Sequence, residues 1–441
     1  MTVTSDSAVR GPGRAGRTGI LAMWSANGIS TLGGQTSNVA IPWFILETTG
    51  SAARTGLVAT AITLGGVLAA VFSGPVIDRL GFKRSSVLTD TGAAVVVAAI
   101  PLLHAAGVLQ FWQILVLGFL IAAMQAPGDT ARYAIVPGLA RRAAMTVERA
   151  NAVDRAVNRG AMLVGPIAGG LLVAVMGPAD VLYVQAAAFV LSALLVAALV
   201  RPGSHEEGAA AAVQAGRHYW SELFVGLRFV LRNGLLVSIV LVVAVANALD
   251  GSLVTVVLPV YARDVWGSPT SLGALTSAIG AGSLLGAALF GAIGHRLPRR
   301  LTVLLGGAGG ALLLYGGLAL TPPLGLMVVL VLLGGVVAGP IVPLLFTVVQ
   351  TVTPTELYGR VFGALQSLSS AAAPFVIAIV GFVVEGAGLV PTIVGLGVLY
   401  LAVTLGMLLN PALRRLDDDR AAPPPERTGA RPASDRTGAG R

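Results

Sequence analysis

Ionisable side chains inside long apolar runs are the first residues of this sequence that could do chemistry. Asp250 lies about halfway along the apolar run 234–261, and Asn247 precedes it by one helical turn. A charge at such a position is costly, so the residue is by default a functional candidate. Its carboxyl group could take up a proton on one side of a membrane and release it on the other as its solvation changes. The alternative is an acid whose hydrogen bonds keep a glycine kink in shape.

Two further acids and two arginines interrupt apolar runs. Asp90 and Asp154 lie one to two turns inside their runs. They are candidates for proton coupling, although both could also reach the membrane interface. Arg155 and Arg159 are four residues apart and therefore share one face of a helix. Arg159 is deep enough that it must either pair with an acid, Asp154 or Asp90, or line a wet cavity that takes an anionic substrate.

Uncharged amides also lie within the apolar runs. Gln35 and Asn38 occupy the first run, and Gln350 and Gln366 lie near the ends of later ones. Amides suit hydrogen bonds to a substrate but equally hold helices together, so both interpretations stay open. We assign Gln35, Asn38 and Asn247, with the deep arginine, to a predicted substrate cavity.

Residues that bind metals or act as covalent nucleophiles are scarce. The chain has no cysteine and four histidines, and it contains neither HExxH nor GxxxxGK[ST]. Thiolate chemistry is therefore excluded, and neither a metal site nor a cofactor is expected. An enzyme would need a paired nucleophile and base or a metal. We expect no enzymatic activity.

The elements that must position these residues are membrane-spanning helices. The 441 residues are 55% apolar and 11% charged, whereas soluble domains carry about 25% charged residues. At roughly 20 residues per crossing the chain has room for about twelve helices. The composition predicts an all-α integral membrane protein with twelve transmembrane helices in two six-helix pseudo-symmetric halves. The predicted spans are 19–46, 54–77, 85–107, 109–131, 148–176, 179–200, 234–261, 269–293, 301–321, 324–350, 358–384 and 388–410.

The distribution of positive charge predicts the orientation. Of the 29 lysines and arginines, 3 lie in the first 18 residues and 7 in residues 412–441. If the N-terminus is cytoplasmic, 15 of the remaining 19, Arg132 among them, fall in short cytoplasmic segments. Arg155 and Arg159 lie inside a predicted helix, and only Arg54 and Arg263 fall on the outer side. This bias predicts a multi-pass protein of the cytoplasmic membrane, with both termini cytoplasmic. No basic stripe with interleaved aromatic residues occurs, so no nucleic-acid partner is expected.

The longest polar break divides the chain into six helices plus six. Apolar residues recur at helical spacing from Trp220 to Leu231, which predicts an amphipathic helix lying along the membrane interface or packed on the bundle. The predicted organisation is a cytoplasmic tail, a six-helix half, a linker with this helix, a second six-helix half and a disordered cytoplasmic tail. Their ranges are 1–18, 19–200, 201–233, 234–410 and 411–441.

The two halves also repeat one another. Residues 74–84 (GPVIDRLGFKR) follow the second span, and residues 291–300 (GAIGHRLPRR) follow the eighth, so that Gly74 corresponds to Gly291 and Asp78 to His295. A parallel repeat of six-helix halves suits alternating access, with a substrate site near the midplane between the halves.

The segment 74–84 carries the most specific motif of the chain. Gly74 permits close helix approach, Gly81 supplies a tight turn, and Asp78 is an acid at a helix end. Its basic members are Arg79, Lys83 and Arg84. The motif Gly-x-x-x-Asp-Arg-x-Gly-x-Lys-Arg resembles the loop between helices two and three of the major facilitator superfamily.

That resemblance implies a cytoplasmic gate. Asp78 would face the positive N-terminus of the eleventh helix, near Gly359 and Arg360, and lock the outward-facing state. Asp129 resembles the partner that this superfamily provides for the basic residues of the loop. The alternative is that these charges only set the topology.

A second element lies in the fifth span. Gly165, Pro166, Gly169 and Gly170 form a GPxxGG sequence. It is similar to the glycine–proline element of exporters in this superfamily, particularly proton-coupled drug antiporters. Proline removes one helical hydrogen bond and the glycines permit close packing, so the helix could bend where the halves meet. Packing alone is the alternative.

Residues 122–170 narrow the resemblance to one branch. The segment resembles the corresponding part of bacterial macrolide-efflux proteins and of the enterobactin exporter, and so does the interface helix at 226–232. The residues that carry this resemblance are Pro127, Arg132, Pro137, Asn151, Ala152, Gly165 and Pro166. The apolar body of the fourth span, 109–128, lacks the buried arginine of many drug–proton antiporters.

Together these features predict a secondary active exporter that moves a small, fairly apolar compound by alternating access, with protons as the coupling ion. The cargo would be drug-like, a macrolide or a siderophore. We expect a monomer whose partners are a small-molecule substrate, protons and the lipid bilayer. An importer or an uncoupled facilitator of a small metabolite is the alternative, whereas a channel would need a continuous polar pore or a carbonyl filter.

Overall fold

The computed structural model describes residues 14–200 and 224–409, and within these ranges the chain is helical and contains no strand. Six long helices form the first half. They are α1 (Arg14–Thr49), α2 (Ala52–Leu80), α3 (Phe82–Ala105), α4 (Phe111–Arg142), α5 (Val147–Met176) and α6 (Pro178–Leu199). The predicted all-helical membrane fold is confirmed.

The second half crosses six times as well, but in shorter pieces. The first three spans are α8 (Gly234–Ser252) with η2 (Leu253–Val257), α9 (Leu258–Tyr261) and η3 (Ala262–Trp266); α10 (Pro269–Ile293) with η4 (Gly294–Arg296); and α11 (Arg299–Leu304) with η5 (Leu305–Gly309), η6 (Leu312–Gly316) and α12 (Gly317–Ala319). The last three are α13 (Leu324–Ala338) with α14 (Ile341–Val352); η7 (Thr355–Leu357) with α15 (Tyr358–Ala371) and α16 (Ala373–Ala387); and α17 (Leu389–Leu409). Segments η2, η3, η5 and η6 are π-helical. Such bulges are frequent at functional sites, and η2 begins three residues after Asp250.

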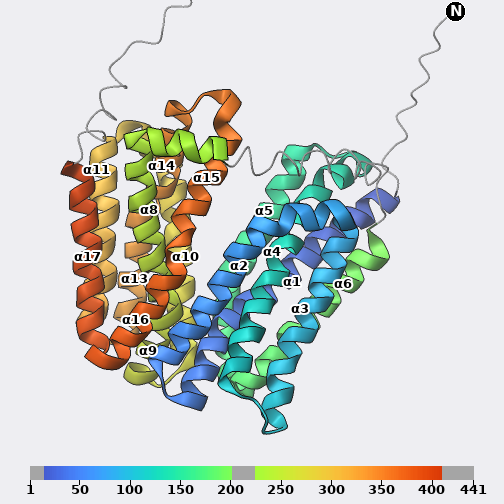
Figure 1. Ribbon diagram of the computed structural model, residues 1–441, viewed down its shortest axis with the longest axis horizontal. Helices are drawn as coiled ribbons and strands as arrows, with labels where there is room; N and C mark the ends of the chain where they lie inside the picture. Colours follow the sequence, from blue (N-terminus) through green and yellow to red (C-terminus); the bar gives the residue numbers. More distant parts are fainter. Residues whose placement is uncertain (1–13, 201–223, 410–441) are drawn as a thin grey trace, which may run out of the picture.

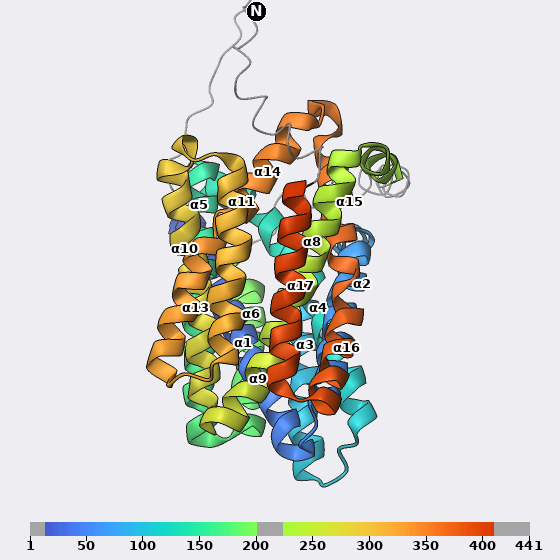
Figure 2. The same cartoon turned by 90° about the vertical axis from the view of Figure 1, so that its left-hand side faces the viewer.

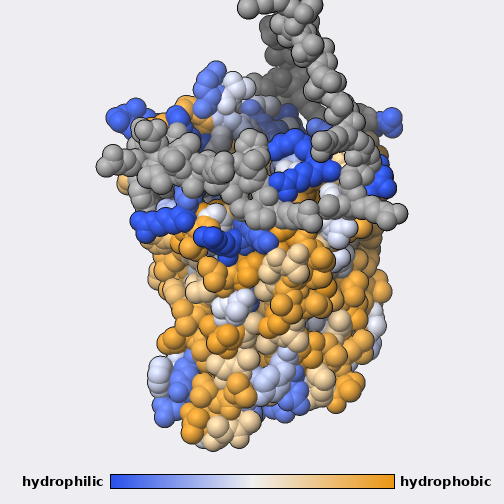
Figure 3. Space-filling model, turned by 90° about the vertical axis from the view of Figure 1, so that its right-hand side faces the viewer, coloured by the Kyte–Doolittle hydropathy of each residue, from blue (hydrophilic) through white to orange (hydrophobic). Residues whose placement is uncertain are grey.

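Eleven of these spans are long and apolar enough to cross a membrane. Helix α1, with 36 residues, is also long enough to cross and is the twelfth span. Its hydropathy is lower because it carries polar residues such as Asn27, Ser30 and Thr36, which are buried inside the bundle. Figure 3 shows the apolar belt of the molecule between two hydrophilic ends. This is the surface expected of a protein surrounded by lipid.

The two halves lie side by side (Figure 1, Figure 2). The start of α1, the end of α6, the start of α8 and the end of α17 lie at one end of the bundle in Figure 1, which we call the tail end. The α1–α2, α9–α10 and α16–α17 connections lie at the other, which we call the distal end. Inter-half packing joins α5 to α10 and α2 to α16.

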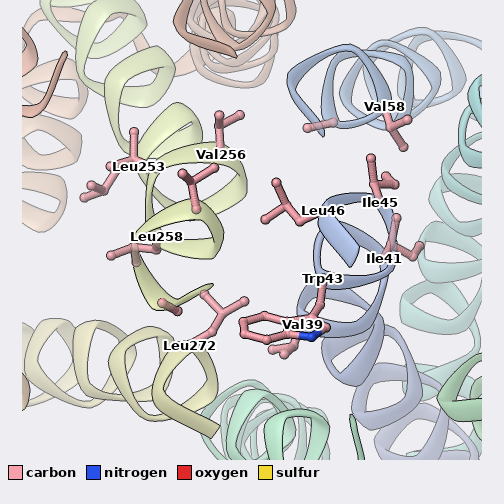
Figure 4. Packing of buried hydrophobic residues seen from close by; sticks show 14 of the residues in the cluster. Val39, Ile41, Trp43, Ile45, Leu46, Val58, Leu253, Val256, Leu258 and Leu272 are labelled. Carbon is pink, nitrogen blue, oxygen red and sulfur yellow. The ribbon is translucent and has the colours of Figure 1, made fainter. Parts of the chain in front are cut away.

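An apolar cluster closes the distal part of the molecule. Leu46 of α1 points toward Val256 of η2 (Figure 4), and Ile45, Leu253 and Leu258 belong to the same apolar cluster. All five side chains are at most 2% exposed. Residues of both halves therefore form one continuous core here, and burial of apolar surface holds the halves together.

Glycines let the backbones of the two halves approach closely in the same region. A Cβ atom on Gly273 of α10 would lie 2.2 Å from the carbonyl oxygen of Pro166, and one on Gly170 would lie 3.0 Å from Cα of Thr270. A Cβ atom on Gly56 of α2 would lie 3.0 Å from Cα of Gly381. Larger residues at these positions would have to push the two halves apart.

The predicted interface helix is present over residues 224–232, while Trp220 and Leu223 lie outside the described residues. Val230 is fully buried, and a Cβ atom on Gly226 would lie 2.2 Å from the carbonyl oxygen of Arg360. Phe224 and Leu231 are exposed. One face of this helix therefore packs on the second half while the other stays open. The predicted N-terminal and C-terminal tails fall largely in residues 1–13 and 410–441, outside the described residues.

Candidate functional site

A cavity of about 490 Å³ lies between α5 of the first half and the second half. Most of its wall is apolar, including Met162, Leu163 and Val242. Its volume lies within the range of about 300–1,000 Å³ that is typical of small-molecule sites. The cavity occupies the middle and tail-end part of the bundle, and the apolar cluster closes the distal side.

Asp250 of α8 lines this cavity together with Asn247. The Asp250 side chain is exposed although α8 lies inside the bundle, because it faces the hollow space. It forms no hydrogen bond or ion pair with any other described residue, and it is the one carboxylate among the described residues of the wall. Asn247 Nδ2 donates to the carbonyl oxygen of Ser369 at 3.5 Å. The arrangement offers a carboxyl group that solvent or a ligand can reach.

Arg159 lines the same cavity from the opposite half of the chain. Its side chain is exposed, and within the described residues it pairs with neither Asp154 nor Asp90. Of the two roles that the sequence left open, the structure places Arg159 on the cavity wall. Arg155 is exposed as well, but it does not line the cavity.

Asp154 is instead held in a polar ladder between α1 and α5. Asn27 Nδ2 donates to Asp154 Oδ1 at 2.9 Å, and Thr31 Oγ1 donates to Asn158 Oδ1 at 2.8 Å. Asn158 Nδ2 in turn donates to the carbonyl oxygen of Asp154 at 3.0 Å. Neither Asn27 nor Asn158 was predicted from the sequence. Asn27 lies four residues before Thr31, and Asn158 lies four residues after Asp154. This spacing places each pair on one helix face and is the sequence signal from which they could have been predicted.

Gln35 and Asn38 lie further along α1 and do not line the cavity. Asn38 Nδ2 donates to Gln35 Oε1 at 3.0 Å. A Cβ atom on Gly165 would lie 2.4 Å from Cβ of Gln35, so this amide sits where α1 and α5 touch. On the other side of α1, Ser37 donates a hydrogen bond to Gln185 of α6.

Asp90 belongs to a buried ionic cluster within the first half. Arg132 Nη1 donates to both carboxylate oxygens of Asp90 at 2.8 Å, and Ser192 Oγ donates to Asp90 Oδ2 at 2.6 Å. Arg132 Nη2 donates to Asp129 Oδ1 at 2.6 Å. Arg132 is 2% exposed and Asp90 is 3% exposed. The cluster ties α3, α4 and α6 together.

This cluster corrects two expectations. Helix α4 runs to Arg142 rather than ending near 131, so Arg132 is a buried helical residue and not a charge in a cytoplasmic loop. For the same reason Asp129 lies well inside α4, where Arg132 is its partner in this structure. The pairing of Asp129 with the basic residues of the 74–84 motif stays a prediction.

The 74–84 motif lies at the tail end, across the α2–α3 turn. Gly81 adopts φ 78°, a left-handed conformation that favours glycine. Lys83 Nζ donates to the carbonyl oxygen of Ala197 on α6 at 2.8 Å. Asp78 has no hydrogen bond or ion pair within the described part of the chain, and a Cβ atom on Gly74 would meet nothing within 4 Å. The predicted contact with the eleventh span is therefore not made in this state, although α15 begins at Tyr358 as expected.

The GPxxGG glycines of α5 serve two different neighbours. Gly165 and Gly169 face α1, since a Cβ atom on Gly169 would lie 2.8 Å from the carbonyl oxygen of Thr36. Gly170 and the carbonyl of Pro166 face α10 in the other half. The element thus packs α5 against both partners, and it lies where the halves meet.

Comparison with known proteins agrees with this architecture. The chain matches the Major Facilitator Superfamily over residues 23–375, with a second match over 240–437. It is 34% identical over 387 residues to the multidrug efflux pump Tap of Mycolicibacterium fortuitum, covering 86% of this chain and 92% of that one. The enterobactin exporter EntS of Escherichia coli O127:H6 is 30% identical over 239 residues, which is 54% of each chain.

Solved structures show the same fold at low sequence identity. The nucleoside transporter NupG superimposes with a TM-score of 0.73 at 13% identity, covering 88% of this chain and 98% of that one. A bacterial homologue of the lysosomal transporter Spinster, in an inward-facing and unoccupied conformation, gives a TM-score of 0.68 at 14% identity and covers 94% of this chain and 100% of that one. The resemblance expected from the 74–84 motif is confirmed, and the chain belongs to the major facilitator superfamily.

Proposed function

We propose that this protein exports a small, largely apolar compound across the cytoplasmic membrane in exchange for protons. The observation that carries the proposal is the cavity that holds Asp250 and Arg159 between a closed distal end and the tail end. Such a cavity at the interface of two repeats is the arrangement that alternating access requires. The efflux proteins similar to this chain support export over uptake.

The orientation follows from charge. Arginine and lysine residues cluster at the tail end, in and near the 74–84 motif and in the interface helix. Because positive segments stay on the cytoplasmic side, we place the tail end and both termini in the cytoplasm. The structure then represents an inward-facing state, in which cargo from the cytoplasm reaches the cavity.

Asp250 is the proposed site of proton coupling. In the inward-facing state its carboxyl group would exchange a proton with the cytoplasm through the cavity. In the opposite state the same group would exchange with the outside, so one carboxyl gains access to each side in turn. Asp90 and Asp154 stay secondary predictions, because Arg132, Ser192 and Asn27 already occupy their carboxylate oxygens.

The cytoplasmic gate would form in the opposite state. Rocking of the halves would bring Asp78 to the start of α15 at Gly359, where the positive end of the helix dipole attracts an anion. Arg79, Lys83, Arg84, Asp129 and Arg360 would complete this gate.

The cavity wall indicates the chemistry of the cargo. Apolar side chains from six spans would bind the body of the molecule, and Asn247, Tyr400 and Thr404 offer hydrogen bonds at defined points. One wall carries a carboxyl group and the other a guanidinium group. A drug-like molecule with few polar groups fits this wall. One chain encloses the cavity, so a monomer suffices.

Everted membrane vesicles with an imposed pH gradient test the proposal. A panel of lipophilic cationic dyes, a macrolide and a catecholate siderophore would be added while the gradient is followed by fluorescence. Dissipation by at least one compound, absent in vesicles without the protein, is the expected result. Accumulation of that compound without any effect on the gradient would instead favour an uncoupled facilitator.

A further inference from the structure

A carboxylate of the second half reaches across to the first half at the distal end. Glu385 lies in the last turn of α16, two residues before the helix ends at Ala387. Its Oε2 atom accepts a hydrogen bond from the backbone N–H of Ala53 at 2.9 Å and another from the hydroxyl of Ser51. These bonds join residues more than 330 positions apart in the sequence, and they connect the two halves directly.

The donors of this contact belong to the N-terminus of α2. The first N–H groups of a helix have no partner within it, and the N-terminus attracts negative charge. Ser51 is the N-cap residue, and its hydroxyl oxygen accepts a hydrogen bond from the N–H of Arg54 at 3.1 Å. The first turn of α2 contains no acidic residue of its own. Glu385 therefore supplies, from the other half, the anion that this helix start lacks.

The contact depends on close packing of α2 against α16. One turn before Glu385, Gly381 approaches Gly56, and deeper in the bundle Thr60 Oγ1 donates to the carbonyl oxygen of Pro374 at 2.9 Å. If the halves separated at the distal end, the Glu385 bonds would break first, since they lie at the rim. They form only while the distal end is closed.

Helices α2 and α15–α16 run antiparallel, so each has its C-terminal end beside the N-terminal end of the other. Glu385 near the end of α16 binds the start of α2. Asp78, near the end of α2, is predicted to face the start of α15. The first contact is made in this structure and the second is not, as expected if each belongs to one of the two states.

We propose that Glu385 is the distal latch of the transport cycle: its carboxylate caps α2 across the halves and stabilises the inward-facing state. This role rests on the proposed alternating access. Because the side chain is exposed, solvent weakens its charge and the latch contributes a modest bias. A charge at an exposed helix N-terminus corresponds to about a two- to fivefold change in an equilibrium. The apolar cluster around Leu46 and Val256 supplies the remainder of the closure.

The absence of cysteine from the sequence makes spin-label distances a direct test. Val108 and Leu320 are exposed residues at the distal end of different halves, and Glu148 and Leu301 are exposed residues at the tail end. Each pair would be changed to cysteine, labelled, and measured in the full chain reconstituted in nanodiscs. Glu385→Ala removes the latch, and Glu385→Gln keeps an acceptor oxygen but removes the charge.

The matched control is Asp180→Ala. Asp180 is an exposed acid in the first turn of α6, also at the distal end, but its helix start is not capped from the other half. Glu385→Ala should raise the population of the distal-open state about two- to fivefold over the wild type. This population is seen as a longer Val108–Leu320 distance and a shorter Glu148–Leu301 distance. Glu385→Gln should give a smaller shift in the same direction, and Asp180→Ala none.

Two results would overturn the latch. One is a pair of Glu385 variants with the wild-type distance distribution, and the other is an equal shift in Asp180→Ala. Vesicle export by the wild type is measured separately. Export with unchanged distances would therefore reject only the latch, whereas the expected distance shift without export by any tested compound would reject the exporter and retain the latch.

Discussion

Asp250 and Arg159 line the same cavity but belong to different halves of the chain. Neither is paired with another described residue, although opposite charges inside a membrane protein normally find partners. Both groups are therefore available to cargo or protons in this state. Because the halves move relative to one another during alternating access, the separation of the two charges would change within each cycle.

Arg159 is expected to select for acidic groups on the cargo. Replacement by Gln removes a charged hydrogen-bond donor, which corresponds to about a tenfold loss of affinity for a ligand that binds the guanidinium group. Export of a compound with an acidic group should fall by about that factor, while a neutral compound should change less than about twofold. Arg159→Lys should recover part of the loss because it keeps the charge. Equal loss for both compounds would show that Arg159 has only a structural role.

Asp78→Asn should lower export without lowering the amount of protein in the membrane. The amide cannot offer a negative charge to the N-terminus of α15, so the outward-facing state should lose stability. Export rate per molecule, normalised by immunoblot of the vesicles, is the measurement. Asp180→Asn, at the opposite end, serves as the control. Wild-type rates in Asp78→Asn would remove the gate hypothesis.

The buried pair of Arg132 and Asp90 is expected to stabilise the first half. Arg132→Met leaves an unpaired buried carboxylate, a change that typically costs about 3–5 kcal/mol. The melting temperature of the purified protein should therefore drop clearly. Combining Arg132→Met with Asp90→Leu should recover much of that loss, because the orphaned charge is gone. If the two changes simply add, the ion pair does not couple the helices as described.

Gly273 is expected to be required for distal closure. An added Cβ atom would lie 2.2 Å from a backbone oxygen of α5, which cannot rotate away. Gly273→Ala should therefore lengthen the Val108–Leu320 distance. Gly291→Ala in the same helix meets open space and should leave the distance unchanged. An unaltered distance in Gly273→Ala would mean that the halves adapt without opening.

The fold could largely be predicted from the sequence, because a membrane-spanning helix is recognisable as an apolar run of roughly 20 residues. The span predicted at 54–77 is α2 at Ala52–Leu80, and α15 begins at Tyr358, beside the predicted gate residues. Asp250 could be found for the same local reason, since an acid in the middle of an apolar run needs no knowledge of its neighbours.

Residues whose roles depend on distant partners were not readable. Arg132 looked like a loop charge, because α4 continues past the apolar run and only folding brings Asp90 against it. Glu385 gave no signal at all, since its partners Ser51 and Ala53 lie at the other end of the sequence. The distinction between Gln35, which packs against Gly165, and Arg159, which lines the cavity, likewise depends on the rotation of each helix in the bundle.

The central claim is that Asp250 couples proton movement to export. The most direct test compares wild-type and Asp250→Asn protein in everted vesicles with an imposed pH gradient, using a compound that the wild type exports. We expect Asp250→Asn to lose cargo-dependent dissipation of the gradient while it still binds the compound, and Asp180→Asn to behave as the wild type. Undiminished dissipation in Asp250→Asn would contradict the account and place the proton site elsewhere.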